Sequence, residues 1–123
     1  MEYRLCPSIL SADFNRLGEQ IQTLEKAGVE WLHIDVTVQP GFGGQKYLPE
    51  CTEKIVELKE LIDREELDVD IQVDGGINDE TMEIVMKAGA NLLVAGSYVF
   101  SGDLETNVYS IQKKMDKIKS EID

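Results

Sequence analysis

The chain is poor in the residues that mark several common classes of protein. Its two cysteines, Cys6 and Cys51, are too few for a disulfide framework and favour the reduced thiols of the cytosol. Lysine and arginine number 12 against 24 aspartates and glutamates, and the net charge of −12 opposes binding to nucleic acid or an anionic membrane. No apolar run approaches the roughly 20 residues of a membrane span, and the N-terminal residues do not resemble a secretion signal. We therefore expect a cytoplasmic protein that binds neither nucleic acid nor membrane.

The remaining composition is that of a globular domain. Hydrophobic residues make up 42% and charged residues 29% of the 123 residues, a length that can bury one core. No linker or low-complexity segment divides the sequence, so we expect a single domain spanning residues 1–123.

Short apolar runs alternate with stretches of helical periodicity along the chain. The runs at 5–10, 31–38, 71–73 and 92–95 predict buried strands, and each is followed by apolar residues spaced three or four apart. Four βα units in succession predict an α/β fold with a parallel sheet covered by helices. The expected core-facing helical residues are Leu17, Ile21 and Leu24; Ile55, Leu58 and Ile62; Met82, Val85 and Met86; and Val108, Ile111, Met115, Ile118 and Ile122.

A glycine-rich segment directly follows the second predicted strand. It contains Gly41, Phe42, Gly43 and Gly44. Because glycine lets a backbone approach a ligand closely and adopt positive φ, the N–H groups of such a segment can converge on an anion. A plain surface loop is the alternative interpretation.

Further polar residues stand where other predicted strands end, the edge at which parallel α/β proteins place their chemistry. His33 and Asp35 are two apart on one strand and so share a face, which suits either a pair of metal ligands or a structural hydrogen bond. Asp74 ends the third predicted strand and is followed by Gly75 and Gly76, a pattern also typical of a turn. Gly96 and Ser97 follow the fourth strand and could offer donors to a phosphate or simply begin a loop.

These motifs, with the segments CPSILSADF at 6–14 and HIDV at 33–36, resemble the ribulose-phosphate 3-epimerase family. The resemblance runs along nearly the whole chain, but a large block of the family pattern is missing between Val36 and Val38. It implies an isomerase of the pentose phosphate pathway and of carbohydrate metabolism. It also implies a truncated ribulose-phosphate-binding barrel of the TIM type, in which four βα units make half a barrel.

The resemblance also assigns roles to the matching positions. His33, Asp35 and Asp74 match the ligands of a divalent metal ion (Zn, Fe, Mn or Co). Asp35 and Asp74 match the acid and base that act on opposite faces of the sugar at C3, and Ser8 matches a substrate-binding serine. The positions that match the phosphate grip are Gly41, Phe42, Gly43, Gly44, Gly75, Gly76, Gly96 and Ser97.

The missing block leaves three functions open. His33 is the only histidine, so the second metal-binding histidine of the family pattern is absent. The chain is expected to interconvert ribulose 5-phosphate and xylulose 5-phosphate, to act on a hexulose 6-phosphate, or to bind phosphorylated sugars without catalysis. Metal analysis and an epimerisation assay would separate these alternatives.

The missing block also bears on assembly. An open sheet of four strands would leave two unpaired edges. Two copies around a two-fold axis would close these edges, and Asp74 would then face His33 and Asp35 of the other chain across the barrel. The sequence therefore leaves two alternatives for assembly, which are a homodimer of half-barrels and an open or aggregating fragment.

Overall fold

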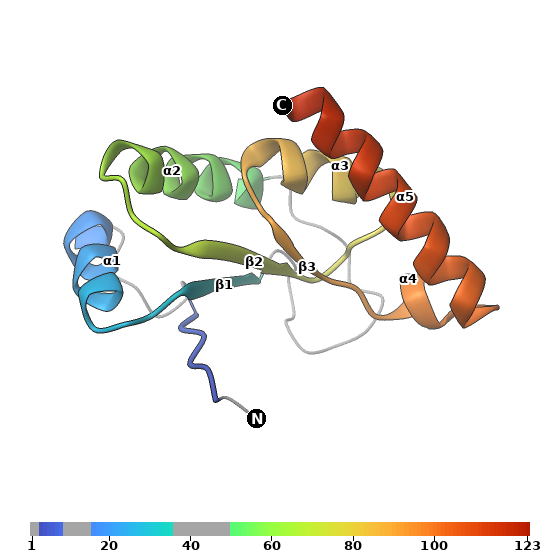
Figure 1. Cartoon of the computed structure of the whole chain (residues 1–123), viewed down its shortest axis with the longest axis horizontal. Helices are drawn as coiled ribbons and strands as arrows, with labels where there is room; N and C mark the ends of the chain where they lie inside the picture. Colours follow the sequence, from blue (N-terminus) through green and yellow to red (C-terminus); the bar gives the residue numbers. More distant parts are fainter. Residues whose placement is uncertain (1–2, 9–15, 36–49) are drawn as a thin grey trace.

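The computed structural model describes residues 3–8, 16–35 and 50–123. The glycine-rich segment with Gly41, Phe42, Gly43 and Gly44 lies outside these residues. In chain order the elements are α1 (Leu17–Lys26), β1 (Trp31–Asp35), α2 (Glu50–Arg64), β2 (Asp70–Asp74), α3 (Asp79–Ala88), β3 (Leu92–Val94), α4 (Ser97–Phe100) and α5 (Leu104–Ile122) (Figure 1).

The strands form one parallel sheet in the order β1-β2-β3, so each strand lies beside its neighbour in the sequence. The register places Asp35 opposite Asp74 and Gln72 opposite Leu92. The first predicted strand is represented by a single parallel bridge between Ser8 and His33. The parallel α/β architecture is thus confirmed with three strands and one bridged segment.

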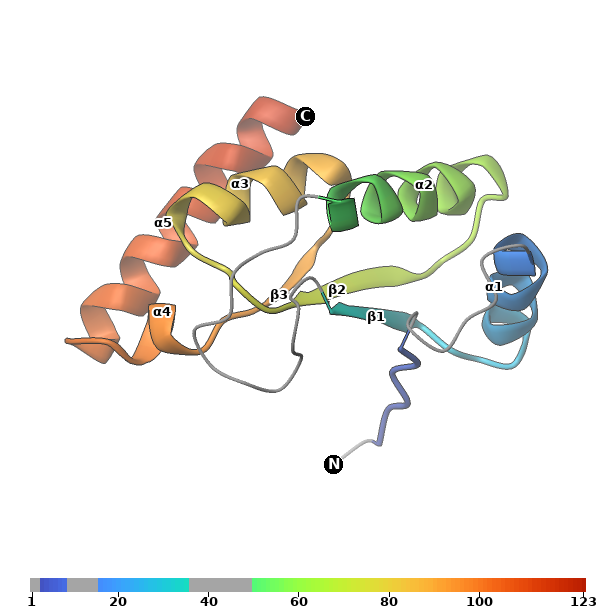
Figure 2. The same ribbon diagram turned by 180° about the vertical axis from the view of Figure 1, so that it is seen from behind.

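Helices α2 and α3 cover one face of the sheet, as both views show (Figures 1 and 2). Alternate strand residues point to that face, where Leu32 and Val73 are completely buried. The predicted helical faces of α2 and α3 also lie in the core. The core therefore sits between the sheet and its helices and holds the carboxyl ends of the strands in fixed positions.

Helix α3 begins at a well-formed cap just after β2. The side chain of Asn78 accepts hydrogen bonds from the backbone N–H groups of Glu80 and Thr81 at 2.9 and 3.0 Å. Thr81 Oγ1 accepts from Asn78 N–H at 2.8 Å and donates to the carbonyl of Gly76 at 2.6 Å. These bonds tie the start of α3 to the loop that follows β2.

The expectation for the last helix is wrong at both of its ends. Ile118 is buried in the core and Met115 packs against it, but Val108 and Ile122 are 40% and 50% exposed. The physical reason is that the described part of the chain supplies no element that covers these two side chains. The short helix α4 is also absent from the sequence prediction, because a single turn has too few residues to show a periodicity.

None of the helices in the described ranges combines the length and apolar character needed to cross a membrane.

Candidate functional site

Two of the predicted metal-binding residues come close together on adjacent strands, His33 in the middle of β1 and Asp74 at the end of β2. His33 Nε2 lies 3.6 Å from Asp74 Oδ2, with the two residues on adjacent parallel strands. The side chains are 21% and 39% exposed, so a ligand can reach both. Asp35 occupies the register position opposite Asp74. A basic nitrogen and a carboxylate thus lie together near the carboxyl ends of the strands, where parallel α/β proteins bind their ligands.

Gln72 is a site residue that the sequence prediction missed. Its Oε1 lies 2.5 Å from His33 Nδ1, and the two residues are register partners on β1 and β2. Because a carbonyl oxygen can only accept, Nδ1 donates in this contact, and Nε2 is the nitrogen beside Asp74. Strand alternation placed Gln72 two residues before Asp74, on the same face, and was the signal that could have revealed it.

Cys6 extends this group of side chains from the N-terminal segment. Its Sγ donates to Gln72 Oε1 over 3.8 Å, so one oxygen accepts from both His33 and Cys6. Burial raises the pKa of the Cys6 thiol. The thiol therefore stays protonated at neutral pH and acts as a weak donor that helps to fix the amide of Gln72.

The loops after β2 and β3 lie beside this group. Gly75 and Gly76 have φ angles of 104° and 62°, in the left-handed region that favours glycine. Gly96 and Ser97 stand where α4 begins. Gly75 and Gly76 thus follow β2, the strand that carries Asp74. Gly96 follows β3, which pairs with β2.

A polar network connects the helices behind these loops. Tyr98 Oη of α4 donates to Asp79 Oδ1 of α3, and Lys114 Nζ of α5 donates to the Asp79 carbonyl at 2.6 Å. Burial, followed by the hydrogen bond to Asp79, raises the pKa of Tyr98 to about 12. The same hydrogen bond, with help from Lys114, lowers the pKa of the Asp79 carboxyl group. The network holds α3, α4 and α5 together behind the candidate site.

The structure therefore brings Ser8, His33 and Asp74 together in one chain, because Ser8 forms the bridge to His33. Among the side chains that the structure describes, which do not include that of Asp35, there is no cluster of three or more histidine, cysteine, aspartate or glutamate residues arranged to hold a metal ion. The described side chains thus provide two donors for a metal, His33 and Asp74.

The family model and the individual proteins that this chain matches all point to one family. A model of the ribulose-phosphate 3 epimerase family matches the chain in two segments, residues 4–37 and 36–100. A ribulose-phosphate 3-epimerase of Bacillus subtilis is 53% identical over 66 residues, which is 53% of this chain and 30% of that protein. The Methanocaldococcus jannaschii epimerase is 47% identical over 79 residues, covering 63% and 34%. The Eremothecium gossypii epimerase is 42% identical over 87 residues, covering 71% and 34%. The matched part thus spans about a third of each relative.

Proposed function

Because this shortened chain belongs to the ribulose-phosphate 3-epimerase family, we propose that it catalyses epimerisation at C3 between ribulose 5-phosphate and xylulose 5-phosphate. The observation that carries the proposal is the approach of His33 to Asp74 at the carboxyl ends of adjacent parallel strands. The described α/β fold is consistent with part of a TIM-type barrel, in which this edge holds the active site.

His33, Asp35 and Asp74 are the proposed ligands of a divalent metal ion. Two ligands at about 2.1 Å from a tetrahedral Zn²⁺ stand about 3.4 Å apart. The 3.6 Å between His33 Nε2 and Asp74 Oδ2 is close to that separation, so this pair fits such an ion. When bound, the metal would polarise the substrate carbonyl oxygen. Fe, Mn and Co accept the same nitrogen and oxygen donors.

The proton transfer is assigned to the two aspartates. One carboxylate takes the proton from C3, and the carboxyl group of the other returns a proton from the opposite face of the sugar, so that the configuration inverts. Gln72 holds the His33 ring in one orientation during this cycle. Ser8 forms a bridge to His33 in the sheet, and we assign to it a contact with a substrate hydroxyl.

The phosphate grip is assigned to backbone N–H groups. Gly75 and Gly76 adopt the positive φ angles that let successive N–H groups converge on an anion. The full set of residues proposed to bind the phosphate is Gly41, Phe42, Gly43, Gly44, Gly75, Gly76, Gly96 and Ser97.

The proposed partners are a phosphorylated ketose and a second copy of the chain. A cytoplasmic location stays a prediction.

An epimerase assay with added zinc, manganese, iron or cobalt tests the proposal. We expect the parental chain to turn over ribulose 5-phosphate and the Asp74→Asn variant to lose at least a hundredfold, the lower end of what a general acid or base contributes. Glu83→Gln, a change on the exposed surface of α3, is the matched control and should retain parental activity. Parental turnover in the Asp74→Asn variant would contradict the assignment.

Phosphosugar binding without catalysis is the second candidate. It is favoured by the single histidine of the chain, because the family pattern has a second metal-binding histidine. Calorimetric titration with ribulose 5-phosphate and with unphosphorylated ribulose separates the two candidates. Preference for the phosphorylated sugar without turnover indicates the binding protein, whereas equal affinity for both sugars argues against both.

A further inference from the structure

Among the residues that the structure describes, the sheet has an open edge on each side. Among the described strands, β3 pairs with β2 alone, and no described strand lies on the outer side of segment 3–8. Asn91 N–H donates to the Ile71 carbonyl at 3.1 Å, so the alternation of a parallel strand turns the N–H groups of Leu92 and Val94 away from β2. Such outward amides are a template for one more parallel strand.

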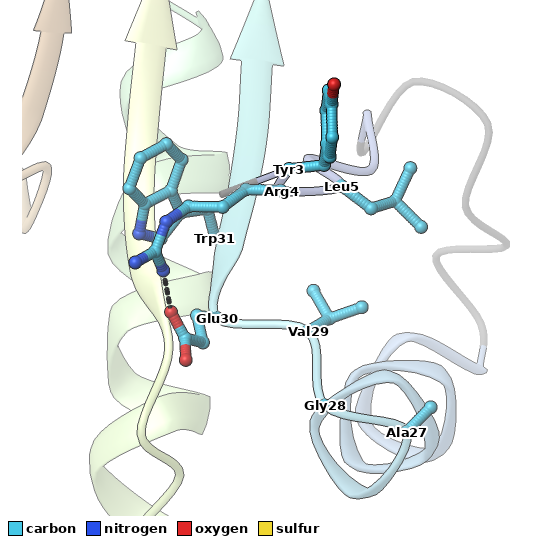
Figure 3. Close-up of a pocket in the computed structure, with 8 residues that line it drawn as sticks. All are labelled: Tyr3, Arg4, Leu5, Ala27, Gly28, Val29, Glu30 and Trp31. Atoms are coloured by element: carbon cyan, nitrogen blue, oxygen red, sulfur yellow. Dashed lines mark hydrogen bonds and ion pairs between the residues drawn. The ribbon is translucent and has the colours of Figure 1, made fainter. Parts of the chain in front are cut away.

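Apolar side chains are exposed at the first of these edges. Tyr3 and Leu5 are 93% and 73% exposed. In Figure 3 Arg4 turns toward Trp31 and Glu30, whereas Tyr3 and Leu5 point away from them. A pocket of about 550 Å³ opens between this segment and residues 27–31. We call Tyr3 and Leu5 the N-terminal edge.

Apolar side chains are also exposed at the opposite edge. Val94 of β3 and Leu104, Val108 and Tyr109 of α5 are all exposed, and we call these four residues the C-terminal edge. Three of them, with Glu105 and Gln112, line a groove of about 430 Å³ on α5.

The groove on α5 faces away from α3. Lys114 of α5 reaches Asp79 of α3, which defines the side of α5 that packs against α3. Gln112, which lines the groove, is two residues earlier and so lies about 200° around the helix from Lys114. The groove therefore lies on the side where the next helix of the layer would stand.

The described helices cover the two faces of the sheet unequally. Parallel sheets are almost always covered on both faces. Helices α2 and α3 cover one face, and no helix of the described ranges covers the other (Figures 1 and 2). His33, Gln72 and Asp74 share that uncovered face by strand alternation. When a sheet closes into a barrel, this face becomes the interior and needs no second layer of helices to cover it.

We propose that a second copy of this chain closes the sheet into a barrel. The N-terminal edge of each copy packs against the C-terminal edge of the other, at two equivalent contacts around a two-fold axis parallel to the strands. This axis keeps every strand parallel and leaves no open edge. Three strands and the bridged segment from each copy make eight, the number whose interior is filled by side chains. Two-fold symmetry is also the commonest in soluble oligomers.

The partner also completes the catalytic site, a consequence that rests on the proposed function. Within one chain the backbones of Asp35 and Asp74 stand side by side on adjacent strands, about 4.8 Å apart. A base and an acid on opposite faces of one carbon must instead flank it, each about 3–3.5 Å away. In the closed pair, Asp74 faces the partner subunit's Asp35 across the lumen, three strands away. The opposing carboxylate therefore comes from the second copy.

Light scattering coupled to size exclusion tests the closed pair. We expect a mass twice that of the 13.8 kDa chain. Leu5→Lys at the N-terminal edge and Val108→Lys at the C-terminal edge should each halve this mass. Val56→Lys on α2 and Ile84→Lys on α3 are matched controls, because both side chains are exposed away from the two edges. The controls should keep the mass of two chains.

Three results would overturn the closed pair. These are a parental chain with the mass of one copy, a mass that rises with concentration beyond two copies, and sensitivity to substitution at one edge alone. Hydrogen exchange of the parental chain gives a second test that needs no variant. The amides of Leu92 and Val94 should exchange at least tenfold more slowly in the pair than after dilution to single chains, and an unchanged rate would contradict pairing at β3.

Mixed chains test the shared site separately from the assembly. Asp35→Asn and Asp74→Asn should each be inactive alone, and refolding them together should restore activity, to at most about a quarter of the parental value, because half of the pairs then hold one Asp74 that faces an unchanged Asp35 of the partner subunit. No recovery from a verified mixed pair would refute the shared site. An inactive parental chain with the mass of two copies would refute the proposed function and leave the closed pair standing.

Discussion

Replacement of Gln72 by leucine tests the orientation of His33 most directly. Leucine has a similar volume but no acceptor, so His33 Nδ1 loses the oxygen that lies 2.5 Å away and Cys6 loses its more distant contact. Loss of the residue that orients a metal-bound histidine weakens metal binding by about 10- to 100-fold. That factor corresponds to about 1.4–2.7 kcal/mol. Folding stability should fall by about 1 kcal/mol, the net value of an ordinary hydrogen bond.

Two measurements check this prediction. Competition with a chelator gives the zinc affinity, and a long-range ¹H–¹⁵N spectrum gives the tautomer of the imidazole. The spectrum is simple to assign because His33 is the only histidine. We expect Nδ1–H in the parental chain and a shift away from this tautomer in Gln72→Leu.

Gln72→Glu is the matched control. It replaces the amide oxygen with a carboxylate oxygen at the same chain length that can accept from Nδ1, so both the tautomer and the metal affinity should be largely retained. An Nε2–H tautomer in the parental chain would refute the reasoning. Parental zinc affinity in Gln72→Leu would show that Gln72 does not position the ligand.

The remaining predictions concern stability around the site. Asn78→Ala should lower the free energy of unfolding by about 1 kcal/mol in urea titrations, and Asn78→Ser should recover most of it, since serine also caps helices. Gly75→Ala should destabilise more than Gly76→Ala, because the φ of 104° lies outside the left-handed helical region that alanine tolerates, whereas 62° lies within it. Tyr98→Phe should destabilise the chain most at neutral pH and least in acid. The lowered pKa of Asp79 means that its bond to Tyr98 stabilises the fold above the unfolded-state pKa and is lost as pH falls through the folded-state pKa. Equal effects of Tyr98→Phe at pH 7 and pH 3 would contradict this linkage.

The sequence predicted the parts of the fold that depend on local patterning. The inward residues of α2 and the Asn78 cap follow from helical spacing and from a side chain that can bond its own backbone, and both are confirmed. The exposure of Val108 could not be predicted in this way. Periodicity shows which residues share a helix face, but not whether another element covers it.

The candidate site was predicted only in part for a similar reason. His33 and Asp74 were found because histidine and aspartate at strand ends are recognisable chemistry, and the structure places them 3.6 Å apart. Gln72 was missed because an amide within a strand is chemically ordinary until its register partner is known. That partner, His33, is 39 residues away in the sequence, and only the pairing of β1 with β2 brings the two together.

The sequential order of the strands has a consequence for the folding pathway. Each strand pairs with its neighbour in the sequence, so every described sheet contact closes through one crossover helix. These parallel pairings still join residues as far as 39 apart in the sequence, so they form more slowly than a hairpin would, but none of the described pairings needs the two ends of the chain to meet first. The sheet of one copy can therefore form in a first-order step. Closure by a second copy follows as a second-order step, so its rate alone depends on the concentration of the protein.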